Sequence, residues 1–198
     1  MDISGASDQL DATRESLMDN FFIAVVLCYL LLVAIFSHWG YPFIIMTTVP
    51  LGIAGGIIGL WLLNHVGAQL PAIGIAAISQ PFDMITMLGF LILVGTVVNN
   101  PILIVDRALT FLREDNLPPE EAVKAAVDAR LRPIMMTMIT TVCGLAPLVF
   151  IPGAGTELYR GVGAIVLFGL LFATLVTLLF LPSLLVTAFR WGQALKRN

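Results

Sequence analysis

A chain of 198 residues in which 59% of the residues are hydrophobic and 12% are charged is not a water-soluble globular domain. Its mean hydropathy of +0.97 is typical of a protein that crosses a membrane several times. The spans and their short connections use nearly all of the length, which excludes a sizeable soluble domain. The net charge of −3 says little, because the placement of charges matters more than their sum.

The chain begins with a polar, acidic segment, residues 1–19, in which a few apolar residues follow a weak helical pattern. This pattern predicts either a short juxtamembrane helix or the remnant of a larger periplasmic domain. The segment has no basic region ahead of an apolar core, so it is not expected to be a signal peptide. An uncharged first span follows at about 20–36.

A tight turn leads into a second span at about 43–64, and Pro42 suits the first turn of that helix, so the two spans are predicted to form an antiparallel hairpin. Pro50 adds a kink. Four glycines spaced three and four residues apart form one stripe of this span, and small residues at that spacing let helices approach closely in lipid. We expect the stripe to serve helix packing; its members are Gly52, Gly55, Gly56 and Gly59.

The connection at 65–83 contains two prolines and is too short for a further span, so it predicts an interfacial or re-entrant loop, with Asp83 as the N-cap of the next helix. That helix is the third span, at about 84–107. It is interrupted by Asn99, Asn100 and Pro101. Proline leaves a carbonyl of the preceding turn without its helical partner. Two interpretations remain open: a packed kink held by interhelical hydrogen bonds, or a polar station in a transport pathway.

One charged helix is predicted at about 118–132, with acidic residues at its start and Arg130 near its end, as the helix dipole prefers. An apolar edge of residues spaced by four predicts that this helix lies at the membrane surface. Pro133 then opens a fourth span at about 134–151, and a fifth follows at about 162–189. The predicted fold is an all-α polytopic membrane protein, with five transmembrane helices within 20–190, one short interfacial helix and a tail at 191–198.

The placement of Lys and Arg predicts the orientation of the bundle. Eight of the ten basic residues lie in the long connection, counted from Arg107 at the end of the third span, or near the carboxyl terminus, and the opposite face has only Arg14 and Arg160. We therefore expect the long connection and the carboxyl-terminal tail to be cytoplasmic and the amino terminus to be periplasmic.

Two spans carry a polar stripe. Thr96, Asn99 and Asn100 share one face of the third span by their spacing, and the fourth span has three threonines at i, i+3 and i+4: Thr137, Thr140 and Thr141. Threonine hydroxyls can bond carbonyls of their own helix, so this second stripe is weak evidence by itself. Together, the stripes predict that the two helices face each other or a common water-filled interior.

The spans lack obvious catalytic or proton-carrying groups. Apart from Asp106 and Arg107 at the end of the third range, they contain no Asp, Glu, Lys or Arg. Proton-coupled transport needs a group that changes charge inside the membrane, and amides and hydroxyls do not. An intramembrane hydrolase is excluded because there is no HExxH motif, Ser–His pairing or carboxylate dyad. Cys28 and Cys143 stand alone in apolar runs, so neither a disulfide nor a metal site is expected.

Several segments together resemble the carboxyl-terminal membrane half of resistance-nodulation-division (RND) efflux transporters, in the branch that exports hydrophobic and amphiphilic drugs. They are VPLG (49–52), GTVVNNPILIVDR (95–107), ARLRPIMMTMITTVCGLAPL (129–148), PGAGTELYRGVG (152–163) and FATLVTLLFLPSLL (172–185). The resemblance covers nearly the whole chain, and the RLRPI-x-MT block followed by GAG is its most specific part.

The resemblance implies that the chain corresponds to helices 8–12 of a twelve-helix inner-membrane permease, with residues 1–19 as the end of the preceding periplasmic domain. It also implies a trimer joined to a periplasmic adaptor and an outer-membrane channel, driven by the proton-motive force without a bound cofactor. No nucleic-acid partner is expected. The missing amino-terminal half would carry the relay acids of helix four and nearly all of the substrate-binding structure.

The family's relay positions map onto this sequence by motif. Asn99 stands where the family has a lysine, and Asn100 matches the asparagine that follows it. Thr137 matches the relay threonine, and Arg130 matches the arginine at the cytoplasmic entrance. A neutral amide at 99 does not form the family's alternating charge pair, which implies an altered relay.

Two hypotheses follow. In the first, the chain forms half of the proton-relay bundle of an efflux permease and does not transport alone. In the second, it is a split-gene or accessory membrane module that assembles with a partner chain without transporting itself.

Overall fold

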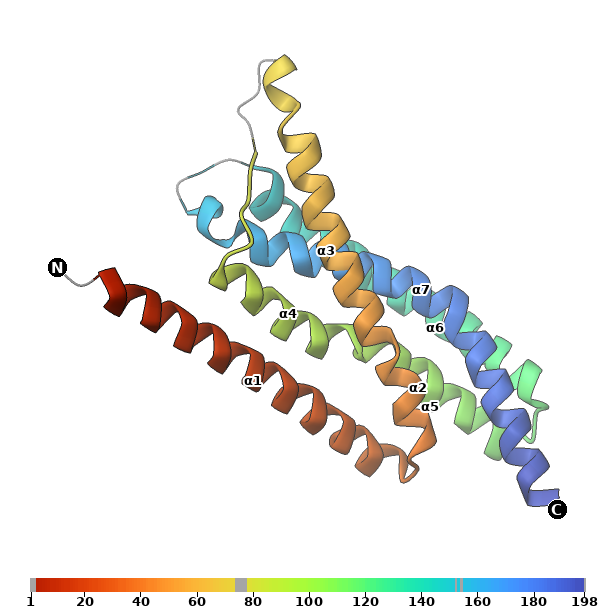
Figure 1. Ribbon diagram of the computed structural model, residues 1–198. Helices are drawn as coiled ribbons and strands as arrows, with labels where there is room; N and C mark the ends of the chain where they lie inside the picture. Colours follow the sequence, from red (N-terminus) through yellow and green to blue (C-terminus); the bar gives the residue numbers. More distant parts are fainter. Residues whose placement is uncertain (1–2, 74–77, 152, 154, 198) are drawn as a thin grey trace.

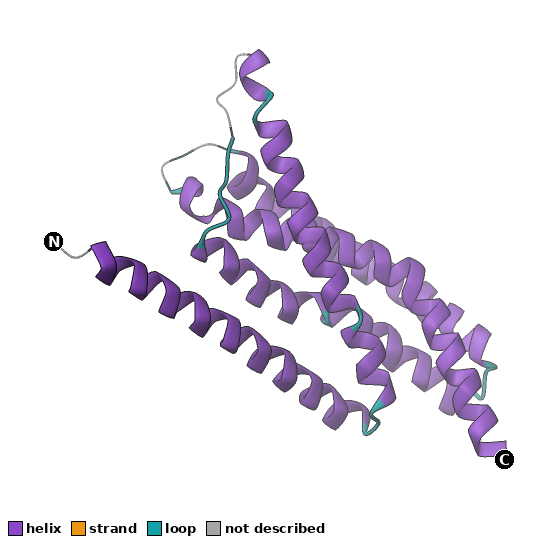
Figure 2. Ribbon diagram, in the orientation of Figure 1, coloured by secondary structure: helices purple, strands orange, loops and turns teal. Residues whose placement is uncertain are grey.

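The computed structural model describes residues 3–73, 78–151, 153 and 155–197, and every regular element in these ranges is a helix (Figures 1 and 2). In chain order the elements are α1 (Ile3–Phe36), α2 (Gly40–Met46), α3 (Thr48–Gly67), the short 3-10 helix η1 (Leu70–Ile73), α4 (Met84–Val97), α5 (Asn99–Arg113), α6 (Pro119–Phe150) and α7 (Thr156–Arg197).

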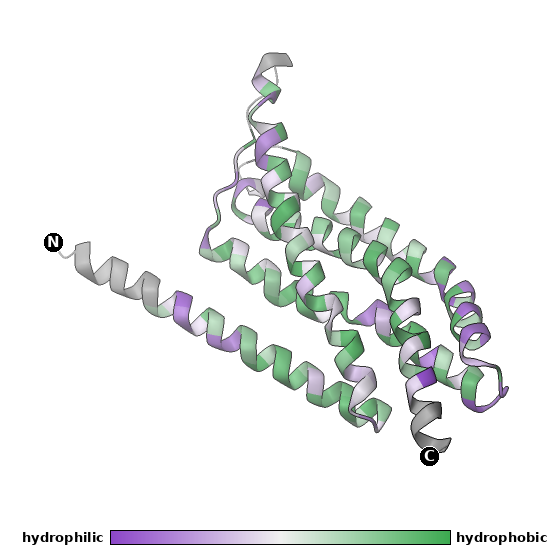
Figure 3. Cartoon of the chain, turned by 45° about the vertical axis from the view of Figure 1, so that its right-hand side comes forward, coloured by the Kyte–Doolittle hydropathy of each residue, from purple (hydrophilic) through white to green (hydrophobic). Residues whose placement is uncertain are grey.

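Five helical segments of the described chain are long and apolar enough to cross a membrane: Ala12–Phe36, Gly40–Gly67, Met84–Arg113, Pro119–Phe150 and Thr156–Trp191. Each exceeds the roughly 20 residues that a bilayer core requires. The prediction of an all-α polytopic membrane protein with five spans is therefore confirmed. Figure 3 shows the apolar middle of the helices and the hydrophilic residues gathered mainly toward their ends.

Two of the predicted spans contain a break, and each break has a proline three residues after it. The second span bends at Thr47, between α2 and α3, and Pro50 follows. The third bends at Val98, between α4 and α5, and Pro101 follows. Because each proline removes one backbone donor, the helical hydrogen bonding is interrupted one turn before it.

The amino-terminal segment is part of the first spanning helix. The sequence favoured a separate short helix or a domain remnant at 1–19, but α1 runs without a break from Ile3 to Phe36. The physical reason lies in the composition, since residues 6–36 contain neither glycine nor proline and nothing interrupts the helix. The tight turn that follows, with Ser37 at φ 48°, produces the predicted hairpin with α2.

The prediction that the helix at about 118–132 is separate from the fourth span is wrong. α6 is one helix from Pro119 to Phe150 and passes through Pro133. The apolar edge of this segment is packed inside the bundle, because Ala122, Val123 and Ala126 are buried and α6 packs against α5 and α7. Burial of this small-residue edge outweighs the one backbone hydrogen bond that Pro133 removes.

α7 lies at the centre of the bundle and packs against α3, α4 and α6. The glycine stripe of α3 faces it: a Cβ placed on Gly55 or Gly59 would collide with Phe172 or Phe168. In contrast, α1 and α6 lie at the periphery, where only 11% of the most apolar stretch of each is buried. Their apolar outer surfaces therefore face lipid or helices that this chain does not contain.

The two ends of the bundle are held by different contacts. At one end, Arg190 of α7 forms an ion pair with Glu120 of α6, so the carboxyl-terminal end and the 114–118 turn lie together. At the other end, the Asn64 side chain exchanges two hydrogen bonds with the backbone of Gln80, of 2.8 and 2.9 Å, which fixes the described part of the 65–83 connection to α3. Asp83 caps α4, as predicted. Figure 1 shows the two termini at opposite ends of the bundle, as an odd number of spans requires.

Candidate functional site

The polar interruption of the third span lies at the junction of α4 and α5. Pro101 has no N–H to offer the carbonyl of Val97, and regular bonding resumes where the Ile102 N–H donates to the Val98 carbonyl at 3.2 Å. Val97, Val98 and Pro101 are all buried, so the bend itself is packed within the bundle. The bend places two consecutive amides, Asn99 and Asn100, next to a cavity.

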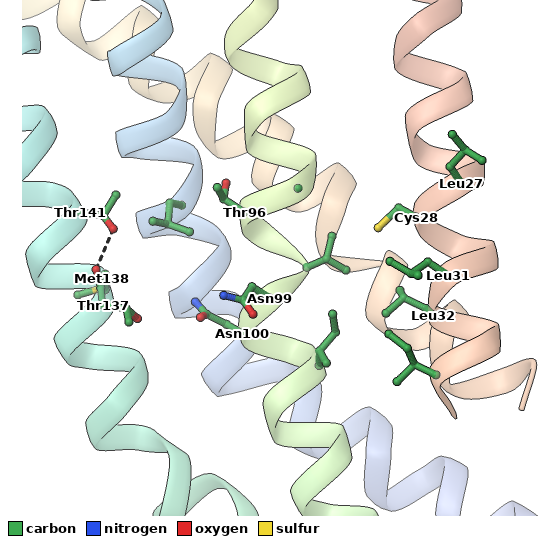
Figure 4. Close-up of a pocket in the computed structure, with 15 residues that line it drawn as sticks. Leu27, Cys28, Leu31, Leu32, Thr96, Asn99, Asn100, Thr137, Met138 and Thr141 are labelled. Atoms are coloured by element: carbon green, nitrogen blue, oxygen red, sulfur yellow. Dashed lines mark hydrogen bonds between the residues drawn. The ribbon is translucent and has the colours of Figure 1, made fainter. Parts of the chain in front are cut away.

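This cavity has a volume of about 850 Å³ and lies between α1, the α4–α5 junction and α6 (Figure 4). The wall supplied by α1 is apolar except for Cys28 and includes Leu31 and Ile35. The polar lining comes from the two predicted stripes: Thr96, Asn99 and Asn100 on one side, and Thr137 and Thr141 on the other.

The two asparagines have different environments. Asn100 is only 8% exposed, and its Nδ2 donates a hydrogen bond of 3.1 Å to Oγ1 of Thr174, which is 1% exposed on α7. Asn99 is exposed on the cavity side. The sequence placed both amides on one polar face, whereas in the structure Asn100 joins α5 to α7 and Asn99 remains available to a group in the cavity.

The threonine stripe of α6 is narrower than the sequence indicated. Thr137 and Thr141 line the cavity, whereas Thr140 lies outside its lining and is exposed. Thr140 follows Thr137 by three residues, a rotation that turns it about 60° away from that side chain. Thr141, four residues after Thr137, stays close to the same face.

The threonine donors are already used within their own helices. The hydroxyl of Thr137 donates to the Ile134 carbonyl at 2.9 Å, and that of Thr141 donates to the Thr137 carbonyl at 2.9 Å, the dashed line in Figure 4. On the facing helix, Thr96 bonds the Ile92 carbonyl at 3.0 Å. These oxygens remain able to accept hydrogen bonds. The cavity therefore offers amide donors and hydroxyl acceptors, and its lining includes no carboxylate, ammonium, guanidinium or imidazole group.

Arg130 lies two turns before Thr137 on α6 and is not part of the cavity lining. Its side chain is half-buried, and its Nε is buried without a hydrogen-bond partner among the described residues. A guanidinium nitrogen held in this way stays unsatisfied until an acceptor from elsewhere reaches it.

Sequence reasoning missed the two buried threonines of α7. Thr174 accepts the bond from Asn100, and Thr177, also 1% exposed, has a buried hydroxyl without a partner among the described residues. Their signal was present as two hydroxyls three residues apart in an otherwise apolar stretch. This spacing places them on the same face of α7 as each other.

The sequence pattern of the AcrB/AcrD/AcrF family matches residues 1–188. The multidrug resistance protein MdtC of Citrobacter koseri is 30% identical over 195 residues, which cover 98% of this chain and 18% of that protein. The MdtC proteins of Escherichia coli and Erwinia amylovora are each 31% identical over 179 residues, which cover 90% of this chain and 16% of theirs. The chain thus spans less than a fifth of the length of these relatives.

Proposed function

Because the chain belongs to the AcrB/AcrD/AcrF family of RND permeases, we propose that it is the carboxyl-terminal membrane portion of a proton-driven multidrug or amphiphile efflux permease. The family consists of transporters and not of catalytic enzymes. In this proposal the bundle lies in the bacterial inner membrane, with its amino terminus periplasmic and its carboxyl terminus cytoplasmic.

The observation that carries the proposal is the composition of the cavity beside Asn99. Its lining combines amides and hydroxyls with an apolar wall and includes no charged group, so it can bind a charged group but cannot drive transport. A carboxylic acid supplied by the missing half would find a donor in Asn99 and acceptors in Thr137 and Thr141. The cavity is then one side of a relay that two halves complete.

Asn99 determines whether this relay works through an ion pair or through a hydrogen bond. A lysine at this position would form an ion pair with a facing carboxylate and release it on protonation. The Asn99 amide donates a hydrogen bond to a carboxylate and accepts one from a protonated acid, so it can follow both states without changing its own charge. The coupling of proton movement to drug transport would then depend on whether Asn99 donates a hydrogen bond to the facing acid or accepts one from it.

Assembly with other chains is also proposed. The apolar outer faces of α1 and α6 support packing against the helices of a missing half. By resemblance, the complete permease is a trimer that contacts a periplasmic adaptor and an outer-membrane channel, and the isolated chain does not transport.

A second candidate function is a split-gene or accessory module that assembles with a separate partner polypeptide without transporting. It is favoured by the apolar outer surfaces of α1 and α6, since only 11% of the most apolar stretch of each helix is buried. Under this hypothesis the same faces of α1 and α6 bind the partner.

Native mass spectrometry of the protein, purified in mild detergent from its own host, tests these proposals. A single larger polypeptide that contains this sequence, or a stoichiometric complex with a chain that carries the missing half, is the expected result. Transport by such a species into proteoliposomes with an imposed pH gradient supports the permease. A stoichiometric complex without transport supports the accessory module. A lone chain, or a mixture of non-specific oligomers, contradicts both.

A further inference from the structure

Asp106 is the carboxylate within the third spanning segment, Met84–Arg113. It follows Asn99 by seven residues on α5, which is nearly two helical turns, so both side chains lie on the same face of the helix. Seven residues correspond to about 10 Å along the helix axis. Both residues are exposed in the bundle, whereas the opposite face of α5 is buried.

Two cavities follow this face of α5 and adjoin each other. The first is the cavity of about 850 Å³ beside Asn99. The second, of about 170 Å³, lies toward the end of the bundle that holds the 114–118 turn and is lined by Asp106, Thr110 and Arg113. Ile35 of α1 lines both cavities. Each is large enough for several water molecules.

The cavity beside Asp106 has one basic and one further acidic residue in its lining. Arg113 and Glu114 line its cavity, and α1 contributes only Ile35 and Phe36 there. Among the described residues Asp106 takes part in no ion pair. The neighbouring Arg107 points elsewhere, since its guanidinium carbon lies 4.5 Å from the centre of the Phe111 ring.

The other helices packed against α5 bring no charge to this cavity. α6 also packs against α5, but none of its residues lines this cavity: Lys124 and Asp128 line a separate cavity with Pro182 of α7, and the half-buried Arg130 lies outside both linings. α2 contains no charged residue. On α7, Arg190 is paired with Glu120.

We propose that Asp106 is a proton-exchanging carboxylate at the cytoplasmic mouth of a water-filled route that leads past Ile102 and Ile35 to Asn99. The inference rests on the proposed proton-driven function and names the group through which the proton leaves. A carboxylate oxygen of Asp106 binds a proton delivered by water from the Asn99 side, and the same O–H bond breaks when the proton passes to cytoplasmic water. The carboxylate is regenerated in each cycle, and no electrons are transferred.

The test uses the complete transporter in liposomes with an imposed pH gradient. Asp106→Asn is expected to lower gradient-driven drug transport by about a hundredfold, the usual order for the loss of a proton-transfer group, while drug binding in the absence of a gradient is unchanged. Asp106→Glu is expected to restore transport to near the wild-type rate and to shift its pH profile. Asp115→Asn removes an exposed carboxylate of the following turn, outside the cavity lining, and is the charge-matched control.

A labelling experiment tests the route independently of transport. In a background in which Cys28 and Cys143 are replaced by alanine, Ile102→Cys is expected to react with a membrane-impermeant thiol reagent added from the cytoplasmic side. Ile92→Cys, at an exposed position of α4 outside the lining of both cavities, is expected to stay unlabelled. Equal protection of both cysteines overturns the route.

The outcomes separate this inference from the proposed function. Wild-type transport by Asp106→Asn together with loss of transport in Asn99→Leu overturns the role of Asp106 and leaves the relay intact. Wild-type transport by both variants overturns the relay and the inference together. Loss of transport in Asp106→Asn without recovery in Asp106→Glu, in a transporter that still binds drug, contradicts proton exchange at this position.

Discussion

Asn100 of α5 donates a hydrogen bond from Nδ2 to Oγ1 of Thr174 on α7, 3.1 Å away, and both side chains are buried. The bond joins two residues that are 74 positions apart in the chain. It crosses next to the bend at Val98, where the backbone bonding of the span is weakest. The pair therefore fixes the rotation of α5 about its axis and, through it, the direction in which Asn99 points.

Removal of this bond is expected to destabilise the bundle modestly. Thr174→Val keeps the shape of the side chain and leaves the Asn100 amide unsatisfied. Interhelical hydrogen bonds in membranes contribute on average about 0.6 kcal/mol in double-mutant cycles, with a maximum near 1.7. We expect a coupling energy of this size between Thr174→Val and Asn100→Leu, measured by unfolding in mixed micelles.

Thr187→Val is the matched control, because the Thr187 hydroxyl is exposed and bonds the Ser183 carbonyl of its own helix. It is expected to change stability little. Additive effects of Thr174→Val and Asn100→Leu, with no coupling energy, would show that the bond does not hold the two helices together.

Asn99 is expected to need a polar side chain. In the complete transporter, Asn99→Lys should retain more efflux than Asn99→Leu, because lysine can donate to a facing acid and leucine offers it no hydrogen bond. Asn99→Leu leaves that acid unpaired in a low-dielectric site, which raises the cost of its charged form. Drug efflux from energised cells that express each variant at equal level measures the difference.

The control for this substitution is Ile92→Leu, which changes an exposed apolar residue of α4 by shape alone. Its efflux should match the wild type. Equal efflux by Asn99→Lys and Asn99→Leu would mean that the polar face at the α4–α5 junction has no part in transport.

The contact between α3 and α7 is expected to tolerate no side chain at Gly59. A Cβ at this position meets Phe168 of α7, so Gly59→Val forces the two helices apart. Overpacking of this kind usually costs about 1–3 kcal/mol. A lower midpoint of thermal unfolding in detergent, followed by circular dichroism, is the expected result.

Gly144→Ala provides the comparison, because a Cβ on Gly144 of α6 has no neighbouring atom within 4 Å. Alanine is the better helix former, so this variant should be as stable as the wild type or slightly more stable. If the two variants unfold at the same temperature, close packing at Gly59 contributes nothing to stability.

The sequence predicted the number of spans because an apolar run of about 20 residues has few alternatives to a transmembrane helix. It also predicted the bend at Pro101 and the cap at Asp83, since both depend on local backbone chemistry. The prediction of a separate helix at 118–132 failed because tertiary packing outweighed the local signal. Pro133 is locally a helix breaker, but the burial of Ala122 and Ala126 within the bundle keeps this segment in one helix with the fourth span.

The partner of Asn100 could not be predicted, because α7 is apolar around nearly its whole circumference. A helix of this kind has no polar face to mark which side is inside. The rotation of α7 about its axis therefore decides whether Thr174 contacts Asn100, lipid or another helix. This rotation is set by the close contact of α7 with the glycines of α3. Packing at one face of α7 thus decides the hydrogen bonding at another.

Asp83 is expected to stabilise the first turn of α4, at the end of the bundle away from the Arg190–Glu120 ion pair. Its Oδ1 accepts hydrogen bonds from the backbone N–H of Thr86 at 2.8 Å and from the Thr86 hydroxyl at 2.6 Å. Asp83→Ala removes this acceptor and with it both hydrogen bonds. The hydroxyl keeps a contact of 3.4 Å with the Pro81 carbonyl, whereas the buried N–H loses its cap.

The cost of this change should be about 1 kcal/mol, the usual value of an N-cap. It should appear as faster amide hydrogen exchange in the first turn of α4, with exchange at the α5–α6 contact unaffected. Asp83→Ser, which keeps an oxygen at the cap, should recover most of the protection. Equal exchange in Asp83→Ala and the wild type would mean that the packing of Thr86 beneath Gly161, rather than the cap, defines where α4 begins.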